Sequence, residues 1–114
     1  MQTIVDIVPL KTGHMEAYQA FLAKLAGPRH AAFVDMLERY GLKTADVYFH
    51  TVAGVPFAIV THLAEDDARI RLEKFASSTH PMEQWFCEQL AALHDFAPLN
   101  GAPQAATLLF HLKK

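Results

Sequence analysis

The chain has a single cysteine, Cys87, among its 114 residues. An internal disulfide needs two cysteines and a cysteine-ligated metal cluster needs several, so the sequence excludes both. A reduced, cytoplasmic setting fits this composition. Cys87 falls in a predicted helix without an evident activating base, and we expect it to be inert.

An excess of charge of one sign is also lacking. Ten Lys and Arg oppose twelve Asp and Glu, which gives a net charge of −2, and the only adjacent pair of basic residues is Lys113-Lys114. This distribution argues against nucleic-acid binding. No run approaches the roughly 20 apolar residues of a membrane span, and the first residues lack the basic start and apolar core of a secretory signal. We therefore expect neither a nucleic-acid nor a membrane partner.

Apolar residues, by contrast, are abundant. Hydrophobic residues make up 52% of the sequence and charged residues 19%, which suits a folded chain with a substantial core. Low-complexity stretches and linkers are not apparent. Length and composition predict one domain, spanning residues 1–114.

The periodicity of apolar residues alternates between that of strands and that of helices. A three-residue loop, Val52-Ala53-Gly54 with Gly54 left-handed, is predicted to join two of the strands as a hairpin. The second helix should bury Ala31, Val34 and Leu37 and end at Gly41. The predicted strands are 2–8, 44–51, 56–63 and 105–112, and the predicted helices are 14–26, the stretch after Pro28, 65–76 and 82–95.

The element order is therefore βαββαβ, which places the chain in the α+β class. Right-handed crossovers favour a four-stranded antiparallel sheet in the order 4-1-3-2, with all helices on one face. Alternation along the strands then divides their side chains between two faces. We expect the larger apolar set to meet the helices: Val5, Ile7, Val47, Phe49, Phe57, Ile59, Leu63, Leu108, Phe110 and Leu112.

The opposite face is predicted to hold Ile4, Asp6, Val8, Tyr48, His50, Ala58, Val60, His62, Thr107, Leu109 and His111. This set is mixed, but it is too apolar for a face left in water. A second copy of the chain is the simplest cover, because twofold homodimers are the commonest assemblies. The alternative is a monomer in which the loop 97–104 folds over the sheet.

Two stretches of sequence carry a resemblance to known proteins. They are RHAAFVDMLERYGLKTADVYFH with the hairpin that follows it, and FASSTHPMEQW, which contains the Ser-x-His-Pro motif Ser78-Thr79-His80-Pro81. The chain resembles the dimeric α/β-barrel superfamily of ferredoxin-like subunits over nearly its whole length. It is similar more closely to a small bacterial family of such domains that has no assigned reaction. The resemblance implies a ferredoxin-like subunit that pairs sheet to sheet.

The hairpin register predicted from the three-residue loop places Asp6 and Tyr48 in one row on the second face. They could hold a small ligand or act as a base and acid pair, or Asp6 could simply bond to Tyr48 or across a dimer interface. His62 and His111 fall at one end of this face. They could shuttle protons, or they could be histidines at the rim.

His50 lies about 20 Å from the level of His62, at about 3.3 Å per residue, and cannot share a small site with it. His80 precedes Pro81 at the start of a helix, where it could serve as acid or base, bind an anion or cap the helix. Two histidines are too few for closed zinc ligation, so we predict no metal site and no cofactor. His94 in a last helical turn would suit the helix dipole as a cation.

Two classes of function remain. The first is a small-molecule enzyme or binding domain. The superfamily that the chain resembles includes mutarotases, isomerases and monooxygenases, and Asp6, Tyr48 and His80 are the catalytic candidates. A haem-degrading monooxygenase is disfavoured because Asp6 stands in place of the expected Asn. The second class is a non-catalytic homodimer that senses a ligand or serves assembly. A cavity in which at least two of the six candidate residues converge would favour the first class; those residues are Asp6, Tyr48, His50, His62, His80 and His111.

Overall fold

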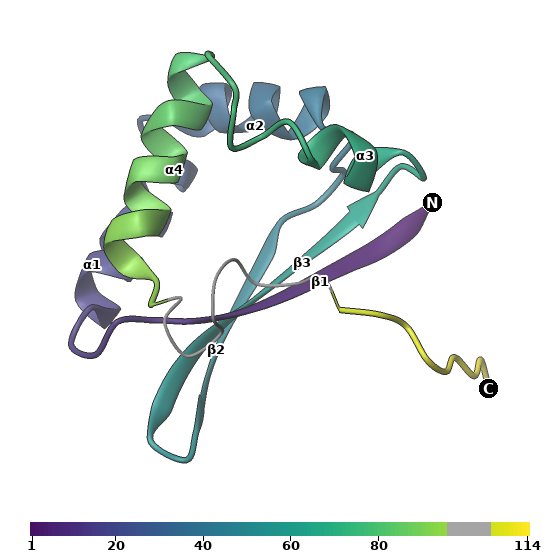
Figure 1. Cartoon of the computed structure of the whole chain (residues 1–114), viewed down its shortest axis with the longest axis horizontal. Helices are drawn as coiled ribbons and strands as arrows, with labels where there is room; N and C mark the ends of the chain where they lie inside the picture. The colour runs from purple at the N-terminus through teal and green to yellow at the C-terminus, as the bar shows by residue number, and fades with distance from the viewer. Residues whose placement is uncertain (96–105) are drawn as a thin grey trace.

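The computed structural model describes residues 1–95 and 106–114. Its elements follow the predicted order through the fourth helical segment (Figure 1). They are β1 (Gln2–Pro9), α1 (Met15–Ala26), α2 (His30–Arg39), β2 (Asp46–Val52), β3 (Val55–Ala64), α3 (Ala68–Leu72) and α4 (Pro81–Leu93).

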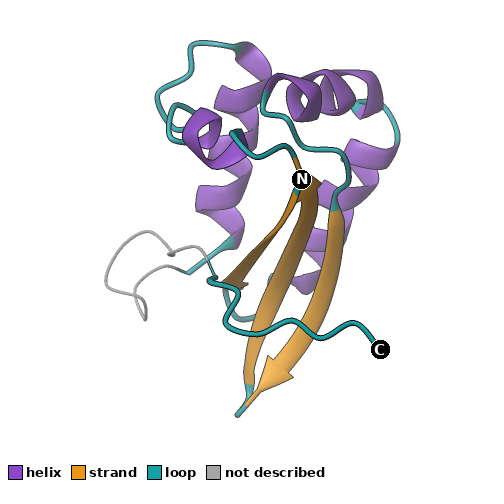
Figure 2. Cartoon of the chain, turned by 90° about the vertical axis from the view of Figure 1, so that its right-hand side faces the viewer, coloured by secondary structure: helices purple, strands orange, loops and turns teal. Residues whose placement is uncertain are grey.

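The three strands form one antiparallel sheet in the order β1-β3-β2, as predicted for these strands. All four helices lie on one side of it, and the other side is left uncovered by helices (Figure 2). We call the first side the inner face and the second side the open face. The predicted fourth strand, 105–112, is not a strand in residues 106–112, and residue 105 lies outside the described part. The loop 97–104 also lies outside it.

The hairpin between β2 and β3 is one residue tighter than predicted. Val52 pairs with Val55, so the loop is the two-residue turn Ala53-Gly54, with φ of 51° and 80°. Two consecutive left-handed residues match the twist of a two-residue hairpin. Gly54 is left-handed as predicted, but the shorter loop moves the β2 register by one residue, and Phe49 rather than Tyr48 lies opposite Ala58.

The assignment of side chains to faces is consequently wrong for most positions. Paired residues in a sheet share a face, and the inner face carries Ile4, Asp6, Val8, Val47, Phe49, Ala58, Val60 and His62. The open face carries Val5, Ile7, Tyr48, His50, Phe57, Ile59 and Leu63. For β1 and β3 this is the reverse of the prediction. Only Val47 and Phe49 lie toward the helices as predicted, and only Tyr48 and His50 lie away from them as predicted.

The helices also differ in detail from the prediction, both in the residues that they bury and in their length. In α2, Met36 is the buried residue, whereas Ala31 and Val34 are exposed. The helix predicted over 65–76 is shorter in the structure, where only α3 is helical. Glu65 does not begin the helix, because its backbone N–H donates to Gly41 O at 2.8 Å and so continues the contacts of β3. Gly41 ends the α2 region with φ of 71°, as its sequence position suggested. Within the described residues, no helix has the length and apolar character needed to cross a membrane.

Candidate functional site

A cavity of about 310 Å³ separates the helices from the inner face of the sheet. Side chains from α1, α2 and α4 form its roof, and β1, β2 and β3 form its floor. The wall is largely apolar and includes several aromatic rings: Phe21, Leu22, Phe33, Leu37, Val47, Val60, Leu72, Phe75, Phe86 and Leu90. An apolar cavity of this size suits a small organic molecule.

Two polar side chains rise from the floor of this cavity. Asp6 on β1 pairs with Val60 on β3, and His62 on β3 pairs with Ile4 on β1. Asp6 and His62 are therefore diagonal neighbours on one face, with Cα atoms roughly 7 Å apart. A carboxylate and an imidazole at this spacing can both contact one small ligand.

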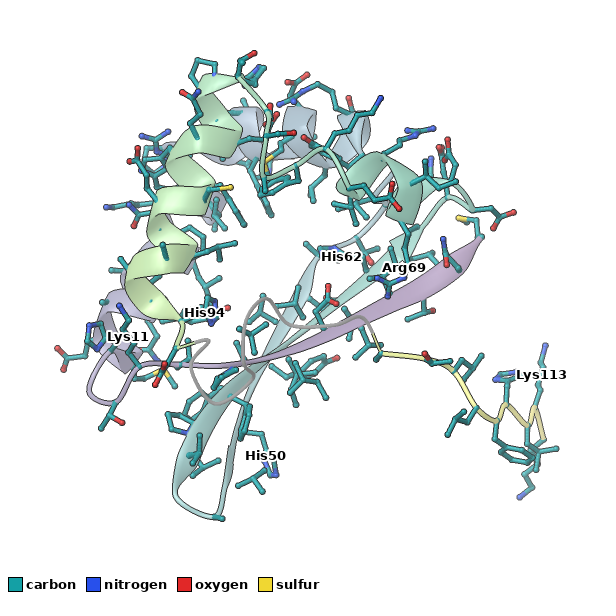
Figure 3. All side chains as sticks on the ribbon, in the orientation of Figure 1. Lys11, His50, His62, Arg69, His94 and Lys113 are labelled. Carbon is teal, nitrogen blue, oxygen red and sulfur yellow. The ribbon has the colours of Figure 1, made fainter. Side chains whose placement is uncertain are left out.

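The orientation of the His62 ring is fixed by a backbone contact. Its Nδ1 lies 2.8 Å from the carbonyl oxygen of Thr44, which can only accept, so Nδ1 carries the donated proton. In the neutral ring Nε2 is then the proton acceptor. Figure 3 shows His62 on the helix side of the sheet. The contact to Thr44 selects the tautomer that an acid–base role requires.

Two further polar rings, those of Tyr18 and His94, line the cavity from its helical side. Tyr18 of α1 is buried, which raises the pKa of its hydroxyl to about 12, so it stays protonated and can donate. Its ring meets that of His94 edge-on, with centroids 5.5 Å apart. His94 Nδ1 lies 3.2 Å from the carbonyl oxygen of Pro9, to which it donates.

His94 is buried and neutral, not the dipole-stabilised cation that the sequence suggested. Burial lowers the pKa of its imidazole, and the hydrogen bond to Pro9 opposes this only in part. His94 is the C-cap residue of α4, its backbone N–H donates to Leu90 O, and it forms an isolated β-bridge with Leu10 just after β1. Tyr18 and His94 were missed as site residues because the sequence pattern shows only helix positions, and no local signal brings the two together.

The other predicted site residues lie elsewhere. Tyr48 and His50 are exposed on the open face, so the predicted row of Asp6 with Tyr48 is wrong. His111 is exposed in the segment after residue 105 and does not lie beside His62 in the described structure. Of the six candidates, Asp6 and His62 do meet at one cavity, but at the inner face. Among the described residues, no group of three or more His, Cys, Asp or Glu could hold a metal ion.

His80 caps α4, which was one of its alternatives. Its Nδ1 accepts from the Met82 N–H at 3.1 Å. Ser78 of the same Ser-x-His-Pro motif donates through its hydroxyl to Glu83 at 2.9 Å. The buried Glu83 carboxylate also accepts from Arg39 at 2.8 Å, so the motif ties α4 to α2. These contacts with Arg39 and Ser78 lower the pKa of Glu83.

We expect the protein to be less stable at pH 5 than at pH 7.5 because of His94. Its folded-state pKa is lowered, so the unfolded chain takes up the proton first, near pH 6.5, and stability is lost as the pH falls from there. Thermal unfolding at the two pH values measures the effect. In His94→Asn, which keeps a donor for Pro9 O, the difference should shrink. An unchanged difference would show that His94 is not responsible.

Comparisons with known proteins add one finding about the fold. No protein-family model and no curated protein sequence matches the chain. Among solved structures, tetracenomycin F2 cyclase from Streptomyces glaucescens, a type-II polyketide cyclase, superposes with a TM-score of 0.70 at 14% sequence identity, covering 100% of this chain and 99% of that chain. The chain therefore shares the ferredoxin-like α+β fold of that cyclase.

Proposed function

We propose that this protein binds a small, flat, mostly apolar molecule in the cavity and catalyses a proton-transfer reaction on it, of the cyclase or isomerase type. The observation that carries the proposal is the pairing of Asp6 and His62 on the floor of an otherwise apolar cavity. In such surroundings a few polar groups orient a ligand strongly, because water competes little with them.

The side chains present suit proton transfer next to a carbonyl group. The Nε2 of neutral His62 can take a proton from a carbon beside the carbonyl, with the Asp6 carboxylate stabilising the charged ring, and the protonated Nε2 can then give this proton to the carbonyl oxygen, which yields the enol. The enol carbon can then attack a second carbonyl to close a ring, or be reprotonated at a new position. Tyr18, which stays protonated, can donate a hydrogen bond to an oxygen of the ligand at the helical side.

The shared fold with a polyketide cyclase supports this proposal. A polyketide carries carbonyl groups, beside which a proton transfer of the proposed kind can act. The likeness is one of fold at low sequence identity, so the residues themselves carry the argument.

The test of the site compares two cavity variants with one control from the opposite face. The probe is 1-naphthol, a flat apolar molecule with one hydroxyl group, titrated by fluorescence. Asp6→Asn and His62→Gln should each raise the dissociation constant about tenfold, since a hydrogen bond to a charged or oriented group is lost. Tyr48→Phe should leave it unchanged, because Tyr48 lies on the open face.

Equal weakening in all three variants would count against the proposed site, as would no effect in any of them. Circular dichroism of each variant shows whether its fold is retained.

We also propose that two copies pair through their open faces. This face carries Ile7, Tyr48 and Ile59, of which Ile7 and Tyr48 are 48% and 60% exposed in the single chain. A contiguous apolar sheet face left in water is unfavourable, and a second copy offers a matching surface. The proposal of a dimer thus rests on a different set of residues from the one that the sequence predicted for this face. Light scattering at micromolar concentration should give the mass of two chains.

A further inference from the structure

We propose that Tyr18 decides which ligands the cavity accepts, because its hydroxyl binds a second oxygen of the ligand at the end of the cavity away from His62. The ligand is then an elongated apolar molecule that carries one oxygen for the pair Asp6 and His62 and another for Tyr18. The inference rests on the proposed function and deepens it, since it states where the ligand carries its oxygens.

The first observation is that the Tyr18 hydroxyl belongs to a buried side chain and yet faces open space. Only 4% of the residue is exposed, and it lines the cavity. In residues 1–95 and 106–114, every completely enclosed nitrogen or oxygen of a buried or half-buried side chain has a hydrogen-bond partner. The Tyr18 hydroxyl makes no hydrogen bond to these described residues, so it is not completely enclosed and opens onto the cavity. A buried hydroxyl without a partner is unfavourable, and an oxygen of the ligand supplies the partner.

The second observation is that Tyr18 and His62 lie at opposite ends of the cavity. His62 pairs with Ile4 near the start of β1, whereas the ring of Tyr18 meets that of His94, which donates to Pro9 O at the end of β1. Along a strand, Ile4 and Pro9 are separated by about 17 Å, at about 3.3 Å per residue. Figure 3 likewise shows His62 and His94 well apart along the sheet. One oxygen cannot serve both ends, so a second one is required.

The third observation is that the Tyr18 ring is held in a fixed direction. The ring of His94 packs edge-on against it, and the ring of Phe21 lies on α1 with its centroid 6.0 Å away. His94 is itself tied to the backbone of β1 through Pro9 O. A group held in this way loses little freedom when it binds a ligand, which favours discrimination between ligands.

The charge state of Tyr18 indicates which kind of oxygen it takes. Burial raises the pKa of Tyr18 to about 12, so the hydroxyl is neutral at neutral pH and can both donate and accept a hydrogen bond. The surrounding wall is apolar, and an apolar wall disfavours a charged carboxylate or phosphate. The second oxygen is therefore that of a carbonyl or hydroxyl group.

The experiment measures how much a second hydroxyl group on the probe strengthens binding. 1,5-Dihydroxynaphthalene has the hydroxyl of 1-naphthol and another on the far ring, and fluorescence titration gives the dissociation constant of each. In the unmodified protein the diol should bind about five- to tenfold more tightly, which is the gain from one additional hydrogen bond. In Tyr18→Phe this gain should disappear, because the second hydroxyl of the probe has no partner. Tyr48→Phe, on the open face, is the matched control and should keep the gain.

An equal gain in Tyr18→Phe and in the unmodified protein would overturn the role of Tyr18, and so would the lack of any gain in the unmodified protein. Urea unfolding separates a role in binding from a role in the fold. Tyr18→Phe should unfold at the same urea concentration or a higher one, since the hydroxyl has no hydrogen bond to a described residue to lose. A lower midpoint with an unchanged gain would assign the hydroxyl to the fold and contradict the inference.

A failure of the proposed function gives a different pattern. If the pair Asp6 and His62 plays no part, Asp6→Asn binds both probes as tightly as the unmodified protein does, while the gain from the second hydroxyl still depends on Tyr18. If only the role of Tyr18 is wrong, Asp6→Asn weakens the binding of both probes, and Tyr18→Phe leaves the gain unchanged.

Discussion

A Val60→Trp variant is expected to lose binding of small apolar molecules while keeping its fold. Val60 lies on β3 in the floor of the cavity, paired with Asp6 on one side and with Val47 on the other. An indole at this position would occupy much of a cavity of about 310 Å³. The dissociation constant for 1-naphthol should rise by about tenfold or more, because the probe and the indole ring would occupy the same space.

The matched control is Val34→Trp, which adds the same ring on the exposed side of α2. This variant should bind the probe as the unmodified protein does. A larger side chain in a packed core lowers the free energy of unfolding by about 1–3 kcal/mol. Thermal unfolding of each variant therefore shows whether a loss of binding reflects a loss of the fold. Retention of full affinity by a folded Val60→Trp protein would place the probe outside this cavity.

The second large effect is expected at Glu83, and it concerns stability. Glu83 is almost fully buried and holds Arg39 of α2, Ser78 before α4 and, more weakly, the hydroxyl of Tyr40 at 3.4 Å. Glu83→Gln removes the charge that Arg39 faces and leaves donors competing for one amide oxygen. Breaking a buried ion pair on one side costs about 3 kcal/mol, and we expect the free energy of unfolding to fall by that amount.

Urea unfolding measures this change, with Asp35→Asn as the comparison. Asp35 is the exposed second partner of Arg39, at 3.1 Å, and such surface pairs contribute less than about 1 kcal/mol. Equal losses in the two variants would mean that the buried carboxylate has no special part in joining α2 to α4. Because the Glu83 network lies apart from the cavity, naphthol binding should survive in whatever fraction of Glu83→Gln remains folded.

The sequence predicted the strands β1, β2 and β3, the helices α1 and α4, and the strand order well, because these depend on local periodicity and on the handedness of crossovers. It failed at the hairpin, where one residue decides the register. Ala53 adopts a left-handed conformation that is uncommon for alanine, so a two-residue turn at Val-Ala-Gly-Val was not the favoured interpretation. This one-residue error in the predicted register places the side chains of β2 on the wrong face relative to those of β3.

Apolarity pointed to the wrong face of β1 and β3, since the more apolar set of residues lies on the open face and the mixed set, with Asp6 and His62, lies on the inner face. Size is the distinguishing property in retrospect. The inner face holds Ala58 and Ala64, both fully buried, whereas the open face holds Phe57 and Ile59. A face chosen by apolar volume alone is therefore assigned to the wrong side.

The candidate site was predicted in part. Asp6 and His62 stood out as ionisable residues in apolar strands, but the sequence placed them in two separate polar spots, with Tyr48 and with His111, whereas in the structure both line one cavity. Tyr18 and His94 did not stand out, because each occupies an ordinary position on a helix. Their proximity arises only when the end of α4 meets Leu10 after β1, a contact more than 80 residues apart in sequence. Tertiary contacts of this kind leave no trace in local periodicity.

The central claim is that the inner face, not the open one, binds the ligand, and methyl NMR spectra during titration with 1-naphthol test it most directly. The methyl signals of Val8 and Val60, which line the cavity, should shift in a saturable way, while those of Val5 and Ile59 on the open face stay in place. Shifts confined to Val5 and Ile59, or no saturable shift at Val8 and Val60, would contradict the account.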